Sequence, residues 1–431
     1  MDRETKVKDK KKKKNETNLP EGWKRVRLGE VIEIFDNQRI PLDSEYRSTI
    51  KGYIPYCGAT GVIDYINDYI FDGEYVLIAE DGGKFNRFEE TAYIMMGKFW
   101  ANNHVHIVRG KDGTLDDCFL MYSVNYQDIS YYISGSTREK LNQQLLKSVV
   151  ILLPPFPEQR KIAEILETVD NAIEKTGRII EKYKRIKQGL MQDLLTRGIV
   201  ESDELGVMSY ELRDEKKHRF KDSPLGRIPE EWKVVELGEI SFITMGQSPS
   251  SSLVNKNGKG MAFLQGNAEF TNKYPSPTNW IKNPLKIANK GSILISVRAP
   301  IGALNLADTQ YCIGRGLASI EASSNFVDSY FLWYSMQFFI DKLVKLGQGS
   351  TFEAIGSNEL KTLSIPLPPL PEQHRIASIL SQIDEAIEKE QKYKEKLERI
   401  KKGLMEDLLM GKVRVNHLIG ENKSLERVEN V

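Results

Sequence analysis

The chain contains the same sequence pattern twice. The segment 153–159, Leu-Pro-Pro-Phe-Pro-Glu-Gln, returns 214 residues later as Leu-Pro-Pro-Leu-Pro-Glu-Gln over 367–373, and this offset holds without a gap along 135–191. Further upstream, a Trp-Lys…Leu-Gly-Glu pattern over 23–30 recurs over 232–239 at an offset of 209. Self-similarity on this scale identifies a tandem duplication whose unit is about half of the chain.

The two copies agree at their ends and differ in the middle. Residues 40–115 and 245–325 match only in scattered places, so a common frame carries two different inserts. Each insert has a candidate buried strand flanked by glycine, at 75–79 and 292–297, which with short helical stretches further on favours an α+β class. A frame that holds two similar folds with different surfaces suits a protein that reads two different things.

Each copy ends in a long predicted helix, over 158–198 and 372–412. Apolar residues recur there at steps of three and four or their multiples, which predicts a coiled-coil seam. A proline and then a glutamate stand at each start, where the proline is tolerated and the carboxylate faces the positive end of the helix dipole. The predicted seam consists of Ile162, Leu166, Val169, Ile173, Ile180, Tyr183 and Leu190, and of Ile376, Leu380, Ile383, Ile387, Leu397 and Leu404.

The two apolar stripes are expected to pack against each other, antiparallel and around a pseudo-two-fold axis. The inserts would then lie at opposite ends of a rigid rod. The alternative is that each helix packs only on its own domain, but a small domain covers only part of so long a stripe. The expected divisions are a disordered Lys-rich tail (1–17), a first domain (18–157), the first long helix (158–198), a linker (199–228), a second domain (229–371), the second long helix (372–412) and a tail (413–431).

Composition excludes some classes without identifying a function. The chain has 431 residues and no apolar run of membrane-spanning length, and its lysine-rich start lacks the apolar segment of a secretory signal, so a cytoplasmic protein is expected. The formal net charge is +1, and Lys/Arg against Asp/Glu number 14 against 19 over 20–157 and 12 against 11 over 229–371. Neither insert is basic overall, so DNA binding would require the basic side chains of an insert to gather on one face of its surface. The lysine run 10–14 fits a solubilising tail better than a phosphate contact.

Motifs for catalysis are absent from the sequence. There is no phosphate-binding GxxxxGK[ST], no GxGxxG after a strand and no HExxH, and the three cysteines lack zinc-ligand spacing. Leu153-Pro154-Pro155-Phe156 only superficially resembles the NPPF-type loop of amino-methyltransferases, because a leucine replaces the polar residue. His104 and His106 would share a strand face, but no third metal ligand lies near them in sequence. We therefore predict no catalytic, cofactor-binding or metal site.

The repeated frame carries a family resemblance. The pattern LPPxPEQxxIAxIL is followed by a helix that ends in GLMxDLL, and it occurs twice, each time after Trp-Lys…Leu-Gly-Glu and Gly-Ser-Thr. This double pattern resembles the specificity subunit of type I DNA restriction-modification enzymes over nearly all of residues 18–415. Segments 58–61 and 71–75 in the first insert, and 296–302 and 312–316 in the second, support it. The chain departs from many members at Pro157 and Pro371, where an acidic residue is usual.

The resemblance implies a tandem pseudo-two-fold repeat of two target recognition domains joined by two long antiparallel helices. It implies a subunit without catalytic activity or cofactor, in which each domain reads half of an asymmetric bipartite site in double-stranded DNA. The helices would set the unread spacer. The implied partners are two AdoMet-dependent DNA adenine methyltransferase subunits and, in the full complex, ATP-dependent endonuclease subunits.

Base contacts are predicted from side chains with forked donors and acceptors on loops, since Arg can clamp guanine and Asn or Gln can clamp adenine. Residues at equivalent frame positions suit phosphate contacts instead. The alternative is that each is a structural arginine or a turn former. The candidates are Lys84, Asn86, Arg87, Asn102, Asn103, Gln247, Gln265, Asn267, Arg298 and Arg315 for bases, and Ser136, Thr137, Arg138, Ser350 and Thr351 for phosphates.

Two other classes remain open at this level. A fused enzyme would combine specificity and methylation in one chain, but the AdoMet and amine-gripping motifs are missing. A coiled-coil adaptor that binds only proteins is compatible with the neutral inserts.

Overall fold

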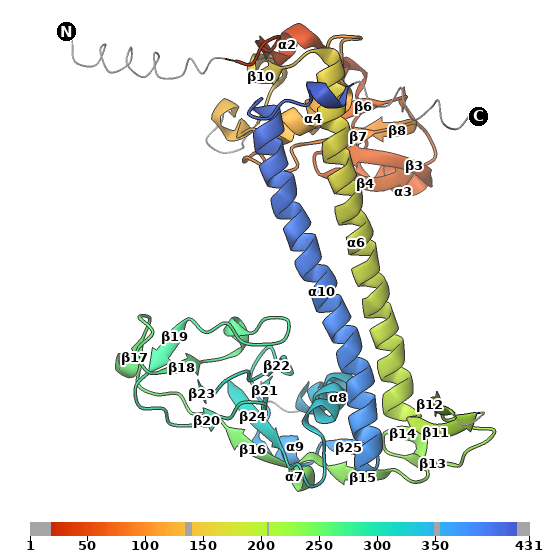
Figure 1. The fold of residues 1–431 in the computed structure, drawn as a ribbon, viewed down its shortest axis with the longest axis vertical. Helices are drawn as coiled ribbons and strands as arrows, with labels where there is room; N and C mark the ends of the chain where they lie inside the picture. Colours follow the sequence, from red (N-terminus) through yellow and green to blue (C-terminus); the bar gives the residue numbers. More distant parts are fainter. Residues whose placement is uncertain (1–18, 134–139, 205–206, 349–353, 420–431) are drawn as a thin grey trace. The chain divides into compact units, whose positions relative to one another are not determined.

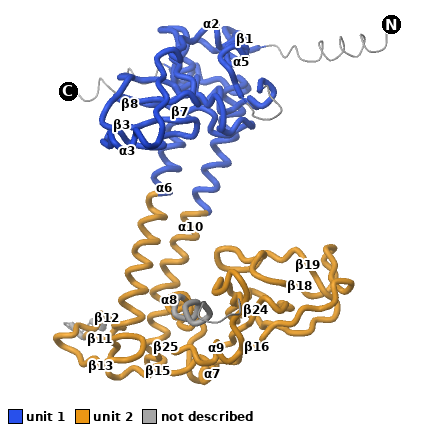
Figure 2. Tube along the Cα trace, turned by 180° about the vertical axis from the view of Figure 1, so that it is seen from behind, with its two compact units in different colours: residues 1–177, 392–431 blue, residues 178–391 orange. Residues whose placement is uncertain are grey.

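The computed structural model describes residues 19–133, 140–204, 207–348 and 354–419. The chain divides into two compact units: unit 1 is Met1–Gly177 with Lys392–Val431, and unit 2 is Arg178–Gln391 (Figure 2). The tail predicted over 1–17 lies outside the described residues, as does the chain beyond residue 419. Among the described residues, no helix is both long and apolar enough to cross a membrane.

The two ends of each repeat meet and form the frame. In unit 1, β1 (Lys24–Arg27) pairs antiparallel with β10 (Val150–Leu153), and in unit 2, β15 (Lys233–Glu236) pairs with β25 (Ser364–Leu367). The repeated Trp-Lys…Leu-Gly-Glu motif is thereby joined to the repeated proline cluster. This pairing explains why the motifs at both ends of the copies are retained while the segments between them differ.

Short helices extend the frame in both units. The glycine of the first repeated Leu-Gly-Glu permits a close approach, because a Cβ added at Gly29 would lie 2.9 Å from Cβ of Lys147. The same holds in unit 2, where a Cβ added at Gly238 would lie 3.0 Å from Cβ of Lys361. The helices are α2 (Leu28–Val31) with α5 (Gln143–Ser148) in unit 1, and α7 (Leu237–Ile240) with α9 (Ser357–Lys361) in unit 2.

The first insert contains two four-stranded sheets, in the orders β2-β9-β6-β7 and β4-β3-β8-β5. All neighbouring strands are antiparallel except β3 and β8. The predicted strand 75–79 is β6, in the interior of its sheet. The strands are β2 (Ile32–Ile34), β3 (Lys51–Gly58), β4 (Gly61–Ile66), β5 (Phe71–Asp72), β6 (Tyr75–Ala79), β7 (Ala92–Met95), β8 (Lys98–Ala101) and β9 (Val105–Gly110), and the helical segments are η1 (Asp36–Gln38), α3 (Ser44–Thr49), α4 (Asp117–Tyr126) and η2 (Ile129–Tyr132).

The second insert repeats this plan with different strand lengths and with one additional strand, β17, in its second sheet. Its sheets have the orders β16-β24-β21-β22 and β17-β19-β18-β23-β20, and again one pair, β18 with β23, is parallel. The strands are β16 (Ser241–Met245), β17 (Val254–Asn255), β18 (Met261–Leu264), β19 (Asn279–Ile281), β20 (Ile287–Ala288), β21 (Ile293–Ser296), β22 (Leu304–Leu306), β23 (Tyr311–Ile313) and β24 (Leu317–Ala322), and the helical segments are η3 (Ser251–Leu253), η4 (Asn267–Glu269) and α8 (Ser329–Gln348).

Both sheets of each insert contribute to one apolar core. In unit 1 this core includes Leu77 and Phe99, and in unit 2 it includes Leu294 and Ile313, all of them fully buried. The helix at the end of each insert, α4 or α8, belongs instead to a larger core together with the frame. The inserts are therefore α+β domains, as the sequence predicts.

Two long helices complete the fold (Figure 1). They are α6 (Phe156–Thr196), with 41 residues, and α10 (Leu370–Leu409), with 40 residues. Both begin two residues earlier than predicted, because the prolines fit inside the first turn. Both end before a glycine in the left-handed region, Gly198 with φ +64° and Gly411 with φ +67°. The helices therefore stop two or three residues earlier than predicted.

Each long helix contributes to both units, which differs from the predicted division into separate domains and helices. The start of α6 and the end of α10 belong to unit 1, whereas the end of α6 and the start of α10 belong to unit 2. Ile162 and Leu166 share the core of unit 1 with Met405 and Leu408. The physical reason is burial, since the frame and α4 or α8 present apolar side chains that the helix ends must cover.

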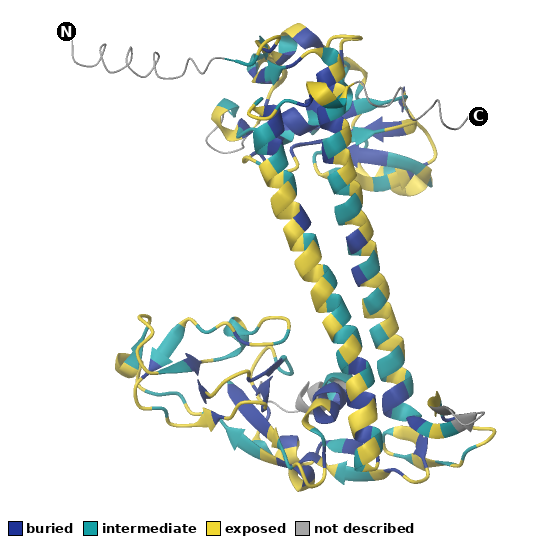
Figure 3. Ribbon diagram, viewed as in Figure 1, coloured by how far each residue is buried: buried dark blue, intermediate teal, exposed yellow. Residues whose placement is uncertain are grey.

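All thirteen predicted seam residues are buried or half-buried, while outward-facing positions along the helices are exposed (Figure 3). The predicted antiparallel arrangement is confirmed within each unit. The seam is not a pure helix-to-helix contact, however, because at the helix ends it merges with the domain cores.

The linker predicted over 199–228 contains two antiparallel hairpins. The first joins β11 (Ile199–Glu204) to β12 (Val207–Leu212), and the second joins β13 (Phe220–Ser223) to β14 (Gly226–Pro229). Backbone pairing organises this charged segment, which shows little apolar periodicity in sequence.

Candidate nucleic-acid interface

Loops of the second insert bring together side chains from distant parts of the sequence. The backbone N–H of Gln247 donates to the carbonyl of Ile313 at 2.9 Å. The Oγ of Ser248 accepts from Nε2 of Gln265 at 2.9 Å and from the backbone N–H of Arg315 at 3.1 Å. Three of the predicted base-contacting residues, which follow β16, β18 and β23, therefore lie in one cluster.

Glycines permit this close approach. A Cβ added at Gly314 would lie 3.0 Å from the carbonyl oxygen of Gln265, and one added at Gly316 would lie 2.9 Å from the same atom. At these distances a Cβ atom would collide with the backbone of Gln265, so both positions exclude residues larger than glycine. The two glycines thus hold the loop of Arg315 against the end of β18.

Arg298 reaches the same cluster from the loop after β21. Its neighbour Val297 donates its backbone N–H to the carbonyl of Gly316 at 2.9 Å. Both Arg298 and Arg315 are exposed, and within the described residues neither guanidinium has an ion-pair partner. Asn267 is half-exposed at the start of η4. The predicted contacts of the second insert are therefore available to a ligand.

The predicted contacts of the first insert are less uniform. Lys84 and Asn103 are exposed. The side-chain amide of Asn86 donates to Oε2 of Glu89 at 3.0 Å, so this asparagine helps to form a turn. Asn102 is only 6% exposed, and its Oδ1 accepts the backbone N–H of His104 at 2.8 Å.

Arg87 is held by structural contacts. Its guanidinium lies 4.5 Å from the ring centroid of Tyr126, donates to the hydroxyl of Tyr126, and lies 3.7 Å from Oε2 of Glu406 on α10. These contacts favour the structural alternative for Arg87. Sequence patterns could not show this, because Glu406 is distant along the chain.

Five predicted phosphate contacts lie outside the described residues. They are Ser136, Thr137, Arg138, Ser350 and Thr351.

A buried polar network that the sequence did not suggest lies beside the loops of the first insert. Nδ1 of His106 lies 2.6 Å from Oδ2 of Asp36, and its Nε2 lies 2.6 Å from the carbonyl oxygen of Leu141. Nη1 of Arg39 lies 2.6 Å from Oε2 of Glu80. Burial opposes ionisation of Asp36, but the hydrogen bond and charge of His106 outweigh it and hold the pKa of Asp36 below its ordinary value. His106 therefore has a structural role, in which its ring joins Asp36 to the backbone of Leu141.

The glutamate at the start of each long helix is held in a polar clasp, in which Glu158 is buried and Glu372 is partly buried. Glu158 accepts from Nε1 of Trp23 at 3.1 Å and from Nε of Arg414 at 2.7 Å. In unit 2, Glu372 accepts from Nε1 of Trp232 at 3.1 Å and is ion-paired with Arg213. The sequence predicted only a dipole interaction for these carboxylates. The clasp explains why the tryptophan and the glutamate are repeated together.

The side chain of the glutamine that follows each of these glutamates binds backbone groups of the insert. Oε1 of Gln159 accepts the backbone N–H of Asp116 at 2.9 Å, and its Nε2 donates to the carbonyl of Thr114 at 2.9 Å. Gln373 accepts the backbone N–H of Asp328 at 2.9 Å. Each glutamine therefore fixes the start of α4 or α8 to a long helix.

A second repeated contact joins the inserts to both long helices. In unit 1, the hydroxyl of Tyr122 donates to Oδ2 of Asp170 at 2.8 Å, and Nζ of Lys401 lies 2.6 Å from Oδ1 of the same carboxylate. In unit 2, Tyr334 donates to Asp384 at 2.7 Å, and Nζ of Lys187 lies 2.7 Å from Oδ1 of Asp384. This Tyr–Asp–Lys contact involves α4 or α8, α6 and α10 in each unit.

The comparisons with known proteins decide the family. The sequence model of the type I restriction modification DNA specificity domain matches residues 20–184 and 229–399, which are the two copies. This chain belongs to the type I restriction-modification DNA specificity family. It is 36% identical over 425 residues to the MjaX type I restriction enzyme specificity subunit of Methanocaldococcus jannaschii, covering 92% of this chain and 95% of that protein.

Solved structures agree with this membership. One solved structure concerns the complex assembly and conformational transition of the type I R-M system. A chain in it is 26% identical to this chain, with a TM-score of 0.54, over 92% of this chain and 100% of that chain. The S subunit of a type I restriction-modification system from M. genitalium, at 15% identity and a TM-score of 0.64, shares the fold over 92% of this chain and 97% of its own.

Membership confirms the predicted tandem repeat of two recognition domains and the predicted role in DNA specificity. Relatives are named as specificity subunits, so the prediction of a chain without catalytic activity of its own is confirmed as well. The fused enzyme and the protein-only adaptor are disfavoured.

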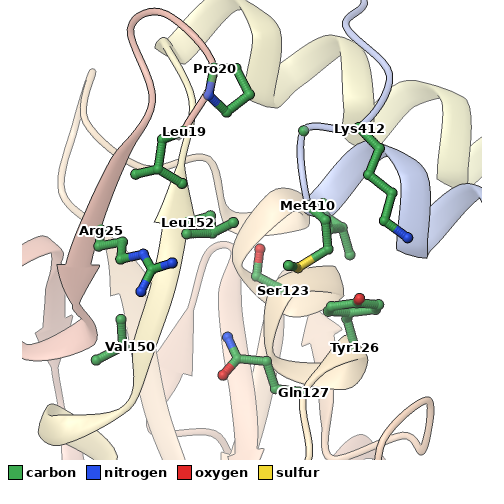
Figure 4. A pocket seen from close by; sticks show the side chains of 12 residues that line it. Leu19, Pro20, Arg25, Ser123, Tyr126, Gln127, Val150, Leu152, Met410 and Lys412 are labelled. Atoms are coloured by element: carbon green, nitrogen blue, oxygen red, sulfur yellow. The ribbon is translucent and has the colours of Figure 1, made fainter. Parts of the chain in front are cut away.

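A cavity of about 520 Å³ in this specificity-family chain lies between β1, β10, α4 and the end of α10 (Figure 4). Leu19, Leu152 and Met410 make its lining largely apolar, and the buried hydroxyl of Ser123 has no partner within the described residues. None of the predicted DNA contacts lines this cavity. The candidate interface is the set of loops that carry the predicted base contacts, which follow β6 and β8 in unit 1 and β16, β18, β21 and β23 in unit 2.

Proposed function

We propose that this chain reads a bipartite and asymmetric sequence in double-stranded DNA as the specificity subunit of a type I restriction-modification complex. The observation that carries the proposal is that two recognition domains of one topology present different side chains on corresponding loops. The second domain offers Gln247, Gln265, Arg298 and Arg315, whereas the first offers Lys84 and Asn103. Different donors and acceptors select different bases, so the two half-sites should differ.

The long helices would set the number of unread base pairs between the half-sites. Both α6 and α10 contribute to both units, and the Tyr–Asp–Lys contact joins them to each recognition domain. Two half-sites about one helical turn apart are the usual target of dimeric DNA binders, and a tandem repeat is the single-chain equivalent of a dimer.

The chemistry would belong to partner subunits. Two AdoMet-dependent adenine methyltransferase subunits would dock on the repeated frame, and ATP-dependent endonuclease subunits would join the full complex. The related chain in a solved type I assembly supports such docking. Flipping of the target adenine would be a task of the methyltransferase, which must reach the base. A subunit that works on chromosomal DNA would be cytoplasmic.

The test is to co-express the chain with its cognate methyltransferase subunit in a methylation-free host and to map adenine methylation by long-read sequencing. The expected result is a motif with two unlike halves and a fixed gap, which disappears when this chain is omitted. Absence of methylation in spite of a stable, co-purified complex would contradict the proposal and favour the protein-only adaptor.

A further inference from the structure

His104 occupies the loop of the first recognition domain that corresponds to the loop of Arg315 in the second. In unit 1, β8 pairs in parallel with β3, and residues 102–104 lead from β8 into β9. In unit 2, β23 pairs in parallel with β18, and residues 314–316 lead from β23 into β24. Within these loops Asn103 takes the place of Arg315 and His104 that of Gly316, because the backbone N–H of Glu80 donates to the carbonyl of His104 as that of Val297 donates to the carbonyl of Gly316.

Three hydrogen bonds fix the position of His104. Its backbone N–H donates to Oδ1 of Asn102 at 2.8 Å, and its carbonyl accepts the backbone N–H of Glu80 at 2.9 Å. Its ring Nδ1 lies 2.6 Å from Oδ1 of Asp81. A side chain restrained at its backbone and at its ring is pre-organised for recognition, in contrast to a flexible lysine such as Lys84.

The partner of the ring determines which nitrogen can meet a ligand. The Asp81 side chain is only 6% exposed, whereas that of His104 is 39% exposed. A carboxylate only accepts hydrogen bonds, so Nδ1 carries a proton and donates to Asp81. In the tautomer that donates from Nδ1, Nε2 carries no proton and lies on the side away from Asp81. Within the described residues this nitrogen has no protein partner.

We propose that His104 reads a base edge in the half-site recognised by unit 1, with Asp81 as its positioning residue. The outward Nε2 accepts a hydrogen bond from the exocyclic amine of an adenine or a cytosine in the major groove. This inference rests on the proposed DNA-reading function. His104 would read beside the exposed Asn103 on the connection between β8 and β9, where the side chain of Asn102 is buried and holds the loop.

The experiment uses the full chain with its methyltransferase subunit and compares two substitutions of His104. His104→Asn retains a donor near the position of Nδ1, so it can keep the bond to Asp81, but it removes the outward nitrogen. His104→Gln extends a polar group outward with different geometry. Arg315→Ala is the matched variant in the corresponding loop of unit 2. Co-purification with the methyltransferase and the melting temperature verify that each variant folds and assembles.

The expected result is a separation between the two half-sites. His104→Asn should lower discrimination at one base pair of one half-site by about tenfold, while the other half-site stays strict. Arg315→Ala should relax a position in the opposite half-site. His104→Gln should alter the preference at the position that His104→Asn relaxes, which verifies the assignment with an independent side chain.

Other results would overturn the inference. If the methylated motif is unchanged in both His104 variants, the ring does not read a base. A uniform fall in methylation with an unchanged motif would show that His104 only positions the loop or contacts a phosphate. Relaxation in the same half-site as Arg315→Ala would contradict the assignment to unit 1. These results leave the proposed function intact, because that function fails only if the wild-type complex yields no bipartite motif.

Discussion

Glu158 in unit 1 and Glu372 in unit 2 each bind a tryptophan and an arginine, but the two arginines come from different kinds of segment. Both stand at the start of a long helix, with side chains that are 2% and 9% exposed, and both accept a hydrogen bond from a tryptophan of the frame. Arg414, which binds Glu158, follows α10 by a few residues, whereas Arg213, which binds Glu372, comes after the hairpin β11–β12. The repeat therefore conserves the chemistry of the clasp and not the route by which the chain supplies the arginine.

The largest effect is expected from charges placed in the two cores. Leu166 and Leu380 are fully buried, so Leu166→Asp combined with Leu380→Asp would bury an unpaired carboxylate in each unit. Each substitution should cost more than about 4 kcal/mol, and folding and methyltransferase assembly should be lost. Co-purification and circular dichroism measure this result.

The control for the two cores uses exposed positions on the same helices. Thr168→Asp combined with Gln382→Asp adds the same charges at residues that face solvent. The variant should fold and assemble. Equal damage from both pairs would mean that added charge, and not burial of the seam, disrupts the protein.

The next effect distinguishes the two clasps. The Arg213 side chain is 6% exposed and that of Arg414 is 28% exposed. Arg213→Ala should destabilise unit 2 by about 3 kcal/mol, because Glu372 is left buried without its counter-charge. Arg414→Ala should destabilise unit 1 by less, about 1.5 kcal/mol, because water can enter the vacated space beside Glu158. Hydrogen exchange monitored by mass spectrometry resolves the two units.

Arg227→Ala serves as the control for the clasps. Its ion pair with Glu215 joins side chains that are 55% and 51% exposed, so its loss should change stability by no more than about 0.5 kcal/mol. A larger loss for Arg414→Ala than for Arg213→Ala would reverse the comparison and show that the clasps rank by burial of the carboxylate, which is 2% exposed in Glu158 and 9% in Glu372, and not by burial of the arginine.

A smaller effect is expected at the Tyr–Asp–Lys contacts. Tyr122→Phe removes the donor to Asp170 in unit 1, and Tyr334→Phe removes the donor to Asp384 in unit 2, while the ring packing is retained. Each should cost about 1 kcal/mol and should act on its own unit. Hydrogen exchange at α4 and α8 reports the loss. Equal changes in both units after a single substitution would contradict independent contacts.

The smallest predicted effect depends on pH and is specific to unit 1. Burial raises the pKa of Asp117 to about 6, and the corresponding residue of unit 2 is Ser329. Because the folded pKa lies above the unfolded one, the folded state binds the proton more tightly. The contribution of Asp117 to stability is complete below about pH 4 and is lost as the pH rises through about 6.

Asp117→Asn isolates this contribution. The wild type should gain stability relative to the variant when the pH falls from 7 to 5, measured as the difference in unfolding free energy of unit 1. A difference that is constant over this range would show that the carboxyl group does not titrate there.

The sequence alone predicts the duplication, the two long helices and the identity of the repeated side chains, because all of these follow from periodicity and offset. It does not predict the clasps, since Arg213 and Arg414 do not stand at a common offset. Nor does it show that Asn102 is buried or that Arg87 packs on Tyr126. Those contacts depend on residues that meet only after folding. The same limit applies to His104 and Asp81, which are separated by 23 positions.

The hydrogen bonds of Gln159 and Gln373 have an evolutionary consequence. Gln159 binds the backbone of Thr114, Asp116 and Pro154, and Gln373 binds the backbone of Phe326, Asp328 and Pro368. Backbone groups are present whatever the side chains, so the joint between frame and recognition domain places little demand on the sequence of the domain. Mutations that change the target can therefore accumulate in the loops while the attachment of the domain remains intact.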